Sequence, residues 1–176
     1  MTNYGFITVA AAVPRTRVAD VQYNVEEIER LIEEAEGKGV ELLVFPELCI
    51  TGYTCQDLFR SSHLLDASDE ALSILTDFSL GRGITFVVGA PHRQDDRLMN
   101  TAVIISNGQR HYVHKTFLPN YNEFYEKRWF SVEDLDAEPR IFRLPSGVTF
   151  GVEICEDLWS AIPPSTTLAT SGADII

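Results

Sequence analysis

The sequence has little positive charge. Its 14 Lys and Arg residues stand against 26 Asp and Glu residues, so the formal net charge is -12. Binding a phosphate backbone requires a cationic face, so nucleic acid is not an expected partner. Long hydrophobic runs are also absent: the apolar opening from Gly5 to Val13 has no Lys or Arg before it, and no later run approaches the ~20 apolar residues of a membrane span. We therefore expect a protein that is neither exported nor inserted in a membrane.

Cysteine is scarce, with only Cys49, Cys55 and Cys155 in the chain. An odd number of cysteines fits a reducing compartment better than a disulfide framework, which favours the cytoplasm. Cys49, Cys55 and His63 could be read as metal ligands, but their spacing fits no common zinc pattern and no fourth ligand is evident. We expect no metal site.

Phosphate-binding loops are missing as well, since neither GxGxxG nor a P-loop occurs. The chain also lacks internal repeats, low-complexity tracts and linker-like stretches. Its 176 residues with 45% hydrophobic content are enough for one core. One domain without a nucleotide cofactor is the expectation.

The apolar runs predict an α/β fold. A strand over residues 5–13 precedes a helix that Asn24 and Glu27 would open as a capping pair, and a continuously apolar run over 42–45 is typical of a strand covered on both faces. Strand, helix and strand form a right-handed crossover unit, which requires a parallel sheet.

Further elements follow along the chain. Asn107-Gly108 favours a two-residue hairpin turn, and Pro145-Ser146-Gly147 favours a second hairpin. The residues from Gly172 to Ile176 resemble a helix stop followed by the start of another buried strand, so we expect a fragment of a longer domain. The remaining expected elements are a helix over 68–80, strands over 84–90, 101–106, 109–114 and 148–154, and a helix beginning near Ser165.

Three reactive side chains stand at the ends of predicted strands. Glu47 lies two residues past the strand ending at Phe45, Lys115 follows His114, and Cys155 follows Ile154. Ligands of α/β sheets bind beyond the carboxyl ends of the strands, so these three side chains are expected at one edge.

The trio suits acyl transfer. A thiol with a pKa of about 8.5 needs a cation or base nearby to act as a nucleophile at neutral pH. Lys115 supplies the cation, and Glu47 can take the thiol proton and later give it to the leaving amine. Lys115 and the backbone N–H after Cys155 can stabilise the oxyanion. The residues thus predict a cysteine-nucleophile amide hydrolase.

Each of these residues also has a plainer interpretation. A Cys after an apolar strand is commonly a buried core residue, Glu47 could be a loop carboxylate and Lys115 a solvated strand end. His114 could pair with Cys155 instead, but strand alternation points His114 and Lys115 to opposite faces. We expect structural or surface roles for His63, His92, His111 and His114. Glu156 and Asp157 have two open interpretations, as a solvated or capping pair or as residues that shape the turn.

Three segments of the sequence resemble the signature motifs of a known family. FPELCITGY (45–53), HKTFLPNYNEFYEKRWF (114–130) and GVEICEDLW (151–159) resemble the three signature regions of the nitrilase superfamily of carbon-nitrogen hydrolases. The resemblance implies an αββα sandwich, incomplete at the carboxy terminus here. It also assigns the catalytic Glu, Lys and Cys to Glu47, Lys115 and Cys155.

TGYTCQDLF (51–59), LPNYNEFYEKRWF (118–130) and CEDLWSAIPPS (155–165) are similar to the amino-terminal glutaminase domain of the glutamine-dependent NAD synthetases. That resemblance implies hydrolysis of glutamine and ammonia delivery to a synthetase domain that uses ATP and Mg to amidate nicotinic acid adenine dinucleotide, in a homo-oligomer. The SGGxDS motif of that domain is absent from this chain. The resemblance also implies a second carboxylate at Glu126, with Glu123 as the alternative, and a glutamine pocket lined by Tyr53, Tyr121 and Phe124.

Two other functions fit the same residues. The chain could belong to a free-standing amidase or nitrilase that acts on another small amide. It could also be a non-catalytic module in a large assembly.

Overall fold

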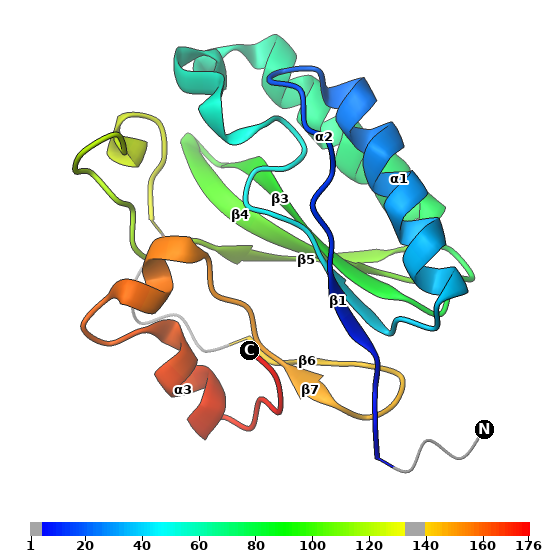
Figure 1. Ribbon diagram of the computed structural model, residues 1–176. Helices are drawn as coiled ribbons and strands as arrows, with labels where there is room; N and C mark the ends of the chain where they lie inside the picture. The colour runs from blue at the N-terminus through cyan, green and yellow to red at the C-terminus, as the bar shows by residue number, and fades with distance from the viewer. Residues whose placement is uncertain (1–4, 133–139) are drawn as a thin grey trace.

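The computed structural model describes residues 5–132 and 140–176. Its centre is a five-stranded sheet in the order β1-β2-β3-β4-β5, in which β1, β2 and β3 are parallel and β3, β4 and β5 antiparallel. Helices α1 and α2 cover one face, whereas β6, β7 and α3 lie on the other side (Figure 1). The strands are β1 Val9–Ala11, β2 Leu42–Val44, β3 Thr85–Gln94, β4 Arg97–Ser106 and β5 Gln109–His114.

The first helix, α1, spans Val21–Gly37 and begins earlier than predicted. Asp20 is its N-cap, and the Asp20 carboxylate accepts from the backbone N–H of Tyr23. The predicted cap at Asn24 is wrong, because this fully buried amide donates to the carbonyls of Arg17 and Ile50. Asn24 therefore ties two loops to the helix. The predicted strand-helix-strand unit is β1–α1–β2, and the parallel pairing of β1 with β2 confirms the predicted parallel arrangement.

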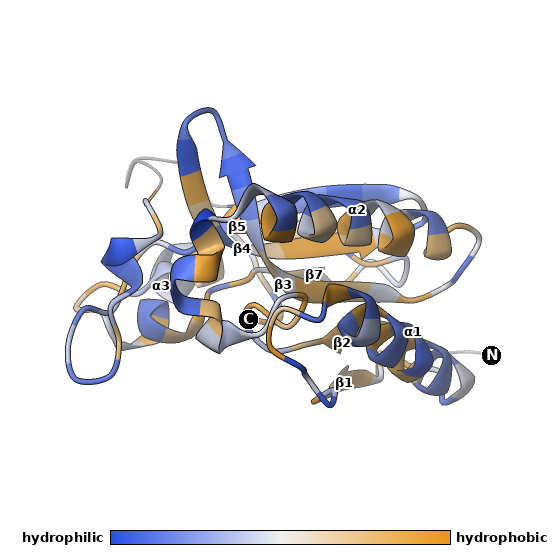
Figure 2. Cartoon of the chain, turned by 90° about the horizontal axis from the view of Figure 1, so that it is seen from above, coloured by the Kyte–Doolittle hydropathy of each residue, from blue (hydrophilic) through white to orange (hydrophobic). Residues whose placement is uncertain are grey.

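The second helix, α2, spans Ser62–Phe78 and begins six residues before the predicted start. Leu64 and Leu65 are buried, so its apolar face extends into the first turn. Both helices pack on the sheet through one hydrophobic cluster, and Figure 2 shows hydrophobic colour in the strands beneath α2 and hydrophilic colour on the outer side of α1. The helices thus hold one face of the sheet rigidly.

Two hairpins extend the sheet. The predicted Asn107-Gly108 turn is confirmed, with φ of 44° and 76° at its two residues. A further hairpin joins β3 to β4, and Asp95 at its turn has a φ of 56°. The predicted strand ended at Ala90 and missed this hairpin, because Pro91 and the polar residues after it interrupt the apolar pattern.

The second layer is small. Strands β6 Phe142–Arg143 and β7 Thr149–Phe150 form the predicted hairpin, with Gly147 at a φ of 93° in its turn. Strand β7 is shorter than the predicted strand over 148–154, and β1 is shorter than the predicted strand over 5–13. Helix α3 spans Pro164–Thr170, and Ile175 bridges to Phe150 in parallel. Short 3₁₀ helices are η1 Tyr53–Arg60, η2 Glu126–Arg128 and η3 Cys155–Trp159. No helix in the described ranges has the length and apolarity to cross a bilayer.

Candidate active site

The loop after β2 positions Glu47. It crosses directly over β3: the backbone N–H of Ile50 donates to the Gly89 carbonyl at 3.1 Å, and the Cys49 thiol contacts the same oxygen at 3.7 Å. Gly89 allows this approach, because a Cβ there would lie 2.2 Å from the Leu48 nitrogen. The side chain of Glu47 keeps 16% exposure above this crossing.

Lys115 lies at the end of β5 and is fully buried. Its backbone N–H donates to the Asn100 carbonyl of β4 at 2.8 Å. Its Nζ donates to Glu47 Oε1 at 2.6 Å and to Glu126 Oε1 at 2.8 Å. The structure therefore brings the predicted base and cation together and adds Glu126, the second carboxylate expected from the resemblance.

Asn100 and Tyr53 complete the hydrogen bonding of the two carboxylates. Asn100 Nδ2 donates to Glu47 Oε1 at 2.6 Å and to Glu126 Oε2 at 3.2 Å, and the Tyr53 hydroxyl donates to Glu126 Oε1 at 2.7 Å. Burial and the hydrogen bond to Glu126 raise the pKa of Tyr53, so it remains a donor. Glu126 thus accepts from three side chains while being 1% exposed.

Cys155 follows a short extended segment and opens η3. Its φ of 47° is unusual for a residue with a Cβ, and its side chain is exposed, unlike Cys49 and Cys55. Cys155 lines a pocket of about 200 Å³ together with Glu47 and Asn100. The predicted thiol therefore shares a solvent-accessible pocket with the predicted base.

The charges around the thiol oppose its ionisation. Burial raises the pKa of Cys155, the negative charge of Glu47 raises it further, and Lys115 lowers it only in part. Burial lowers the pKa of Lys115, but attraction to Glu47 and the hydrogen bonds that Nζ donates to both carboxylates outweigh it, so the net shift is upward and Lys115 stays charged. The raised pKa favours the protonated thiol at Cys155, and the Glu47 side chain lies in the same pocket.

Asp157 resolves one of the open interpretations. Its side chain is buried, and its oxygens accept from the backbone N–H groups of Thr116, Phe117 and Ile154. Burial raises the pKa of Asp157, although these three hydrogen bonds oppose the shift. Asp157 is therefore not solvated: it caps η3 through the Ile154 N–H, as one interpretation expected, and it shapes the turn by binding the Thr116 and Phe117 segment, as the other expected.

Aromatic side chains stand beside the carboxylates. Tyr53 and Tyr121 each meet the ring of Phe124 edge-on, at centroid distances of 6.3 and 6.0 Å. The Tyr121 hydroxyl donates to Glu156 at 2.7 Å, next to the candidate nucleophile. The three aromatic residues predicted to line a substrate pocket thus form one group, whereas Glu123, the alternative second carboxylate, is exposed.

The other candidate residues lie elsewhere. His114 contacts Thr101 at 2.8 Å and stacks on His92 at 5.7 Å between ring centroids. Cys49 and Cys55 are buried, and burial raises the pKa of Cys49 to about 12. Within the described ranges, no group of three His, Cys, Asp or Glu side chains is arranged to hold a metal ion.

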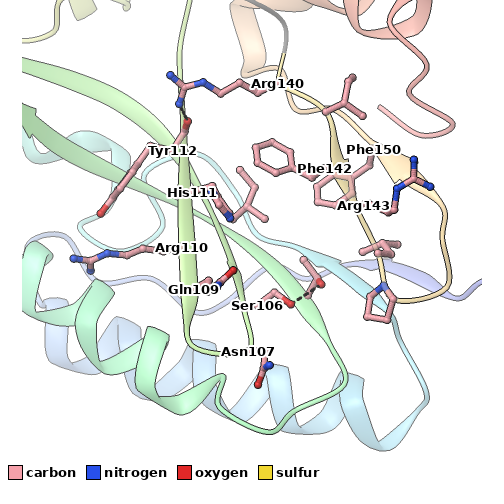
Figure 3. A pocket seen from close by; sticks show the side chains of 15 residues that line it. Ser106, Asn107, Gln109, Arg110, His111, Tyr112, Arg140, Phe142, Arg143 and Phe150 are labelled. Carbon is pink, nitrogen blue, oxygen red and sulfur yellow. Dashed lines mark hydrogen bonds between the residues drawn. The ribbon is translucent and has the colours of Figure 1, made fainter.

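A larger pocket of about 1060 Å³ lies between β5 and the β6–β7 hairpin (Figure 3). His111 and Tyr112 line one side, and Phe142 and Arg143 the other. It contains none of the predicted site residues.

Sequence comparison agrees with this geometry. The family model of the carbon-nitrogen hydrolases matches residues 8–176, so the chain belongs to the carbon-nitrogen hydrolase family.

The particular relatives are more informative. The glutamine-dependent NAD(+) synthetase of Mycobacterium tuberculosis is 35% identical over 99% of this chain, and that of Synechocystis sp. is 33% identical over 87%. The chain spans only 28% of the length of each. A crystal structure of the Cytophaga hutchinsonii glutamine-dependent NAD(+) synthetase superimposes with a TM-score of 0.83 at 27% identity, covering 96% of this chain and 30% of that one.

An amidase from Nesterenkonia sp. has the same fold, with a TM-score of 0.82 at 22% identity, over 96% of this chain and 63% of that one. The predicted nitrilase-like α/β architecture is therefore confirmed.

Sequence reasoning did not find Asn100. It lies in the middle of a hairpin strand, and the only signal was a polar amide directly before an apolar run. The role of its side chain depends on two carboxylates that are distant in sequence.

Proposed function

We propose that this chain hydrolyses the side-chain amide of glutamine and that the protein containing it uses the ammonia to amidate nicotinic acid adenine dinucleotide. The geometric support is the contact of buried Lys115 with Glu47 and Glu126, beside a pocket that Cys155 and Glu47 share. Glutamine as the substrate is supported by the relatives, which are glutamine-dependent NAD(+) synthetases and align with nearly all of this chain. The synthetase domain, ATP and Mg of the proposal belong to the remainder of such a protein.

In the proposed reaction, the Cys155 sulfur attacks the amide carbon while Glu47 takes the thiol proton. The negative charge that develops on the amide oxygen is stabilised by Lys115 and by the backbone N–H of Glu156. Glu47 then gives its proton to the departing nitrogen, which leaves as ammonia from a thioester. A water molecule attacks this thioester, Glu47 takes its proton and returns it to the sulfur, and glutamate leaves.

Lys115 and Glu126 have constant charges in this scheme. Glu126 accepts three hydrogen bonds and is almost completely buried, which suits a group that orients Lys115 without exchanging protons. Glu47 is the more exposed carboxylate and lines the pocket, which suits the residue that shuttles the proton.

The test is Cys155→Ala in the protein as its gene encodes it. We expect glutamine-dependent turnover to disappear while free ammonia still supports synthesis, because only the ammonia-releasing step needs the thiol. Cys55→Ala is the control, since that thiol is buried and bonds the Thr51 carbonyl. Retained glutamine use by Cys155→Ala would refute the proposal.

A free-standing amidase and a non-catalytic module make different predictions. An amidase would release ammonia from glutamine or another small amide without any ATP-dependent synthesis. A module would show no labelling of Cys155 by a glutamine-mimicking electrophile, whereas the proposed glutaminase is labelled and glutamine protects it.

A further inference from the structure

One buried carboxylate joins two distant segments of the chain. Asp157 is 1% exposed, and its Oδ1 accepts from the backbone N–H groups of Thr116 at 3.0 Å and Phe117 at 2.7 Å. Its Oδ2 accepts from the backbone N–H of Ile154 at 2.9 Å. Three backbone donors thus converge on one side chain.

The donors stand directly beside the reactive residues. Thr116 follows Lys115, and Ile154 precedes Cys155. The carboxylate therefore holds the backbone one residue away from the cation and one residue away from the thiol. These two segments come from different layers, β5 of the main sheet and the strand end after β7.

The turn that carries Cys155 needs such a support. Cys155 has a φ of 47°, a left-handed conformation that is strained for a residue with a Cβ. The η3 helix is only five residues long, and its N-cap Ile154 makes no side-chain hydrogen bond. An apolar N-cap side chain cannot accept from the first helical N–H groups. The turn is instead held by the Asp157 N–H, which donates to the Ile154 carbonyl at 3.1 Å, and by the Asp157 carboxylate, which accepts from the Ile154 N–H.

We propose that Asp157 is a positioning residue that sets the separation of the Cys155 sulfur from the Lys115 ammonium by binding the backbone beside both. This inference rests on the proposed hydrolase function. The hydrogen bonds of Asp157 go to backbone N–H groups, that of Ile154 at the pocket wall and those of Thr116 and Phe117 beyond Lys115, so Asp157 acts through the two segments it joins.

Asp157→Asn disturbs one side of this arrangement more than the other. The Asn oxygen can still accept from Thr116 and Phe117, but the amide nitrogen then faces the Ile154 N–H, and two donors repel each other. The Cys155 segment therefore shifts while the Lys115 segment keeps its bonds. A misplacement of about 1 Å can cost on the order of 10²-fold in rate.

The experiment measures glutamine hydrolysis by wild type and Asp157→Asn, with the active sites counted by a thiol-directed electrophile. We expect kcat per titrated thiol to fall by about 10²-fold, with KM changed by less than about threefold. A purely structural role would reduce the number of titrated sites and leave kcat per site unchanged. Asp174→Asn is the matched control, because Asp174 also accepts a backbone N–H, that of Thr149 at 2.9 Å, away from the pocket.

A wild-type kcat per titrated site in folded Asp157→Asn overturns the proposal. If that variant does not fold, amide hydrogen exchange of the wild-type protein decides. Protection of Thr116, Phe117 and Ile154 comparable to that of β3 amides supports the proposal, whereas exchange at solvent rates during full turnover overturns it.

Failure of the proposed function gives a different result. In that case the wild type does not hydrolyse glutamine, whereas the pH profile of Cys155 alkylation still tests the positioning. A profile in Asp157→Asn that departs from wild type supports the role of Asp157, and an identical profile overturns it.

Discussion

Glu47 and Glu126 are the same residue type held by the same lysine, yet their surroundings differ. Glu126 accepts from Lys115, Tyr53 and Asn100 and is almost completely buried. Glu47 accepts from Lys115 and Asn100 and borders the pocket that contains Cys155. Glu126 is thus fixed by hydrogen bonds on both of its oxygens, whereas Glu47 is the carboxylate that faces the thiol across the pocket. The surroundings, rather than the residue type, therefore suit Glu126 to orienting Lys115 and Glu47 to the proposed role of base.

Glu47→Gln should change the thiol and the turnover in opposite directions. The Glu47 charge contributes to the raised pKa of Cys155, and the thiolate is the form that reacts with alkylating agents. Removing that charge lowers the pKa of Cys155, so alkylation at neutral pH becomes faster and its pH profile moves to lower pH. Loss of the general base should lower kcat for glutamine hydrolysis by about 10²–10⁴-fold.

Rates of alkylation by iodoacetamide from pH 6 to 10 and steady-state hydrolysis of glutamine provide the two measurements. Glu70→Gln, on the exposed side of α2, is the control and should alter neither. An alkylation profile that moves to higher pH in Glu47→Gln would contradict the electrostatic account.

For single residues, the sequence indicated Glu47, Lys115 and Cys155 because each follows the end of a predicted strand, and strand ends can be predicted from apolar runs and from hairpin turns such as Asn107-Gly108. Asn100 could not be predicted, since an amide within a strand gives no signal until both carboxylates are placed beside it. For Asn24, in contrast, the sequence contained a signal that was misinterpreted. Its residue type and spacing fit a helix cap, but the amide is used to hold two loops instead.

At the scale of elements, the site depends on how closely the loop after β2 can approach β3. The loop passes over Gly89, and it is the backbone of Glu47 and Leu48 that a side chain there would meet. Because the obstruction would be backbone rather than the end of a flexible side chain, the loop itself would have to move. Glu47, the proposed base, can thus occupy its position because the neighbouring strand has no side chain at Gly89.

Gly89→Ala should therefore impair both stability and catalysis. A Cβ would lie 2.2 Å from the Leu48 nitrogen and 2.8 Å from the Glu47 carbonyl carbon. Overpacking of this kind costs about 1–3 kcal/mol of the free energy of unfolding, and displacement of Glu47 should lower kcat by about 10²-fold. Urea unfolding and glutamine hydrolysis measure the two effects.

Gly37→Ala is the matched control, because a Cβ there would meet nothing within 4 Å. It should leave kcat unchanged and keep the free energy of unfolding within about 1 kcal/mol. Wild-type kcat in Gly89→Ala would show that the loop position does not govern the base.

Element prediction succeeded where local chemistry decides. The Asn107-Gly108 turn needs positive φ at both residues, and few residue pairs offer that, so the hairpin could be predicted. The β3–β4 hairpin was missed because its turn contains Asp95, which carries no comparable signal. The end of β7 was misplaced because Val152 and Ile154 continue an alternating apolar pattern after Phe150, although these residues leave the ladder to reach Cys155.

At the scale of the whole molecule, the site lies between two hydrophobic clusters. The cluster on the helix side contains Phe45, Leu48 and Leu118, which flank Glu47 and follow Lys115. The other cluster contains Phe150 and Ile154, which precede Cys155. The base and the cation are thus anchored in one layer and the thiol in the other. The packing of the two layers around the site could be expected only from the resemblance to the nitrilase superfamily, because no local sequence pattern indicates which layers pack together.

This division predicts that equal damage to the two clusters has unequal consequences. Phe150→Leu and Phe86→Leu shorten side chains that are 2% and 0% exposed, one in each cluster. Each should lower the free energy of unfolding by about 1–2 kcal/mol, less than the ~3–5 kcal/mol typical of Phe→Ala. Only Phe150→Leu lets the layer that carries Cys155 settle differently against the sheet, so only this variant should lower kcat per titrated thiol, by roughly three- to tenfold.

Denaturant unfolding measures whether Phe150→Leu and Phe86→Leu lose similar stability. Glutamine hydrolysis, divided by the number of titrated thiols, then gives kcat per active site for the two variants. Equal losses of kcat per thiol in the two variants would mean that the layers do not position the site separately. A loss confined to Phe150→Leu would instead show that packing of the small second layer sets the distance at which the thiol meets its proposed base, because Phe86 lies in β3 of the main sheet, in the cluster on the side of Glu47 and Lys115.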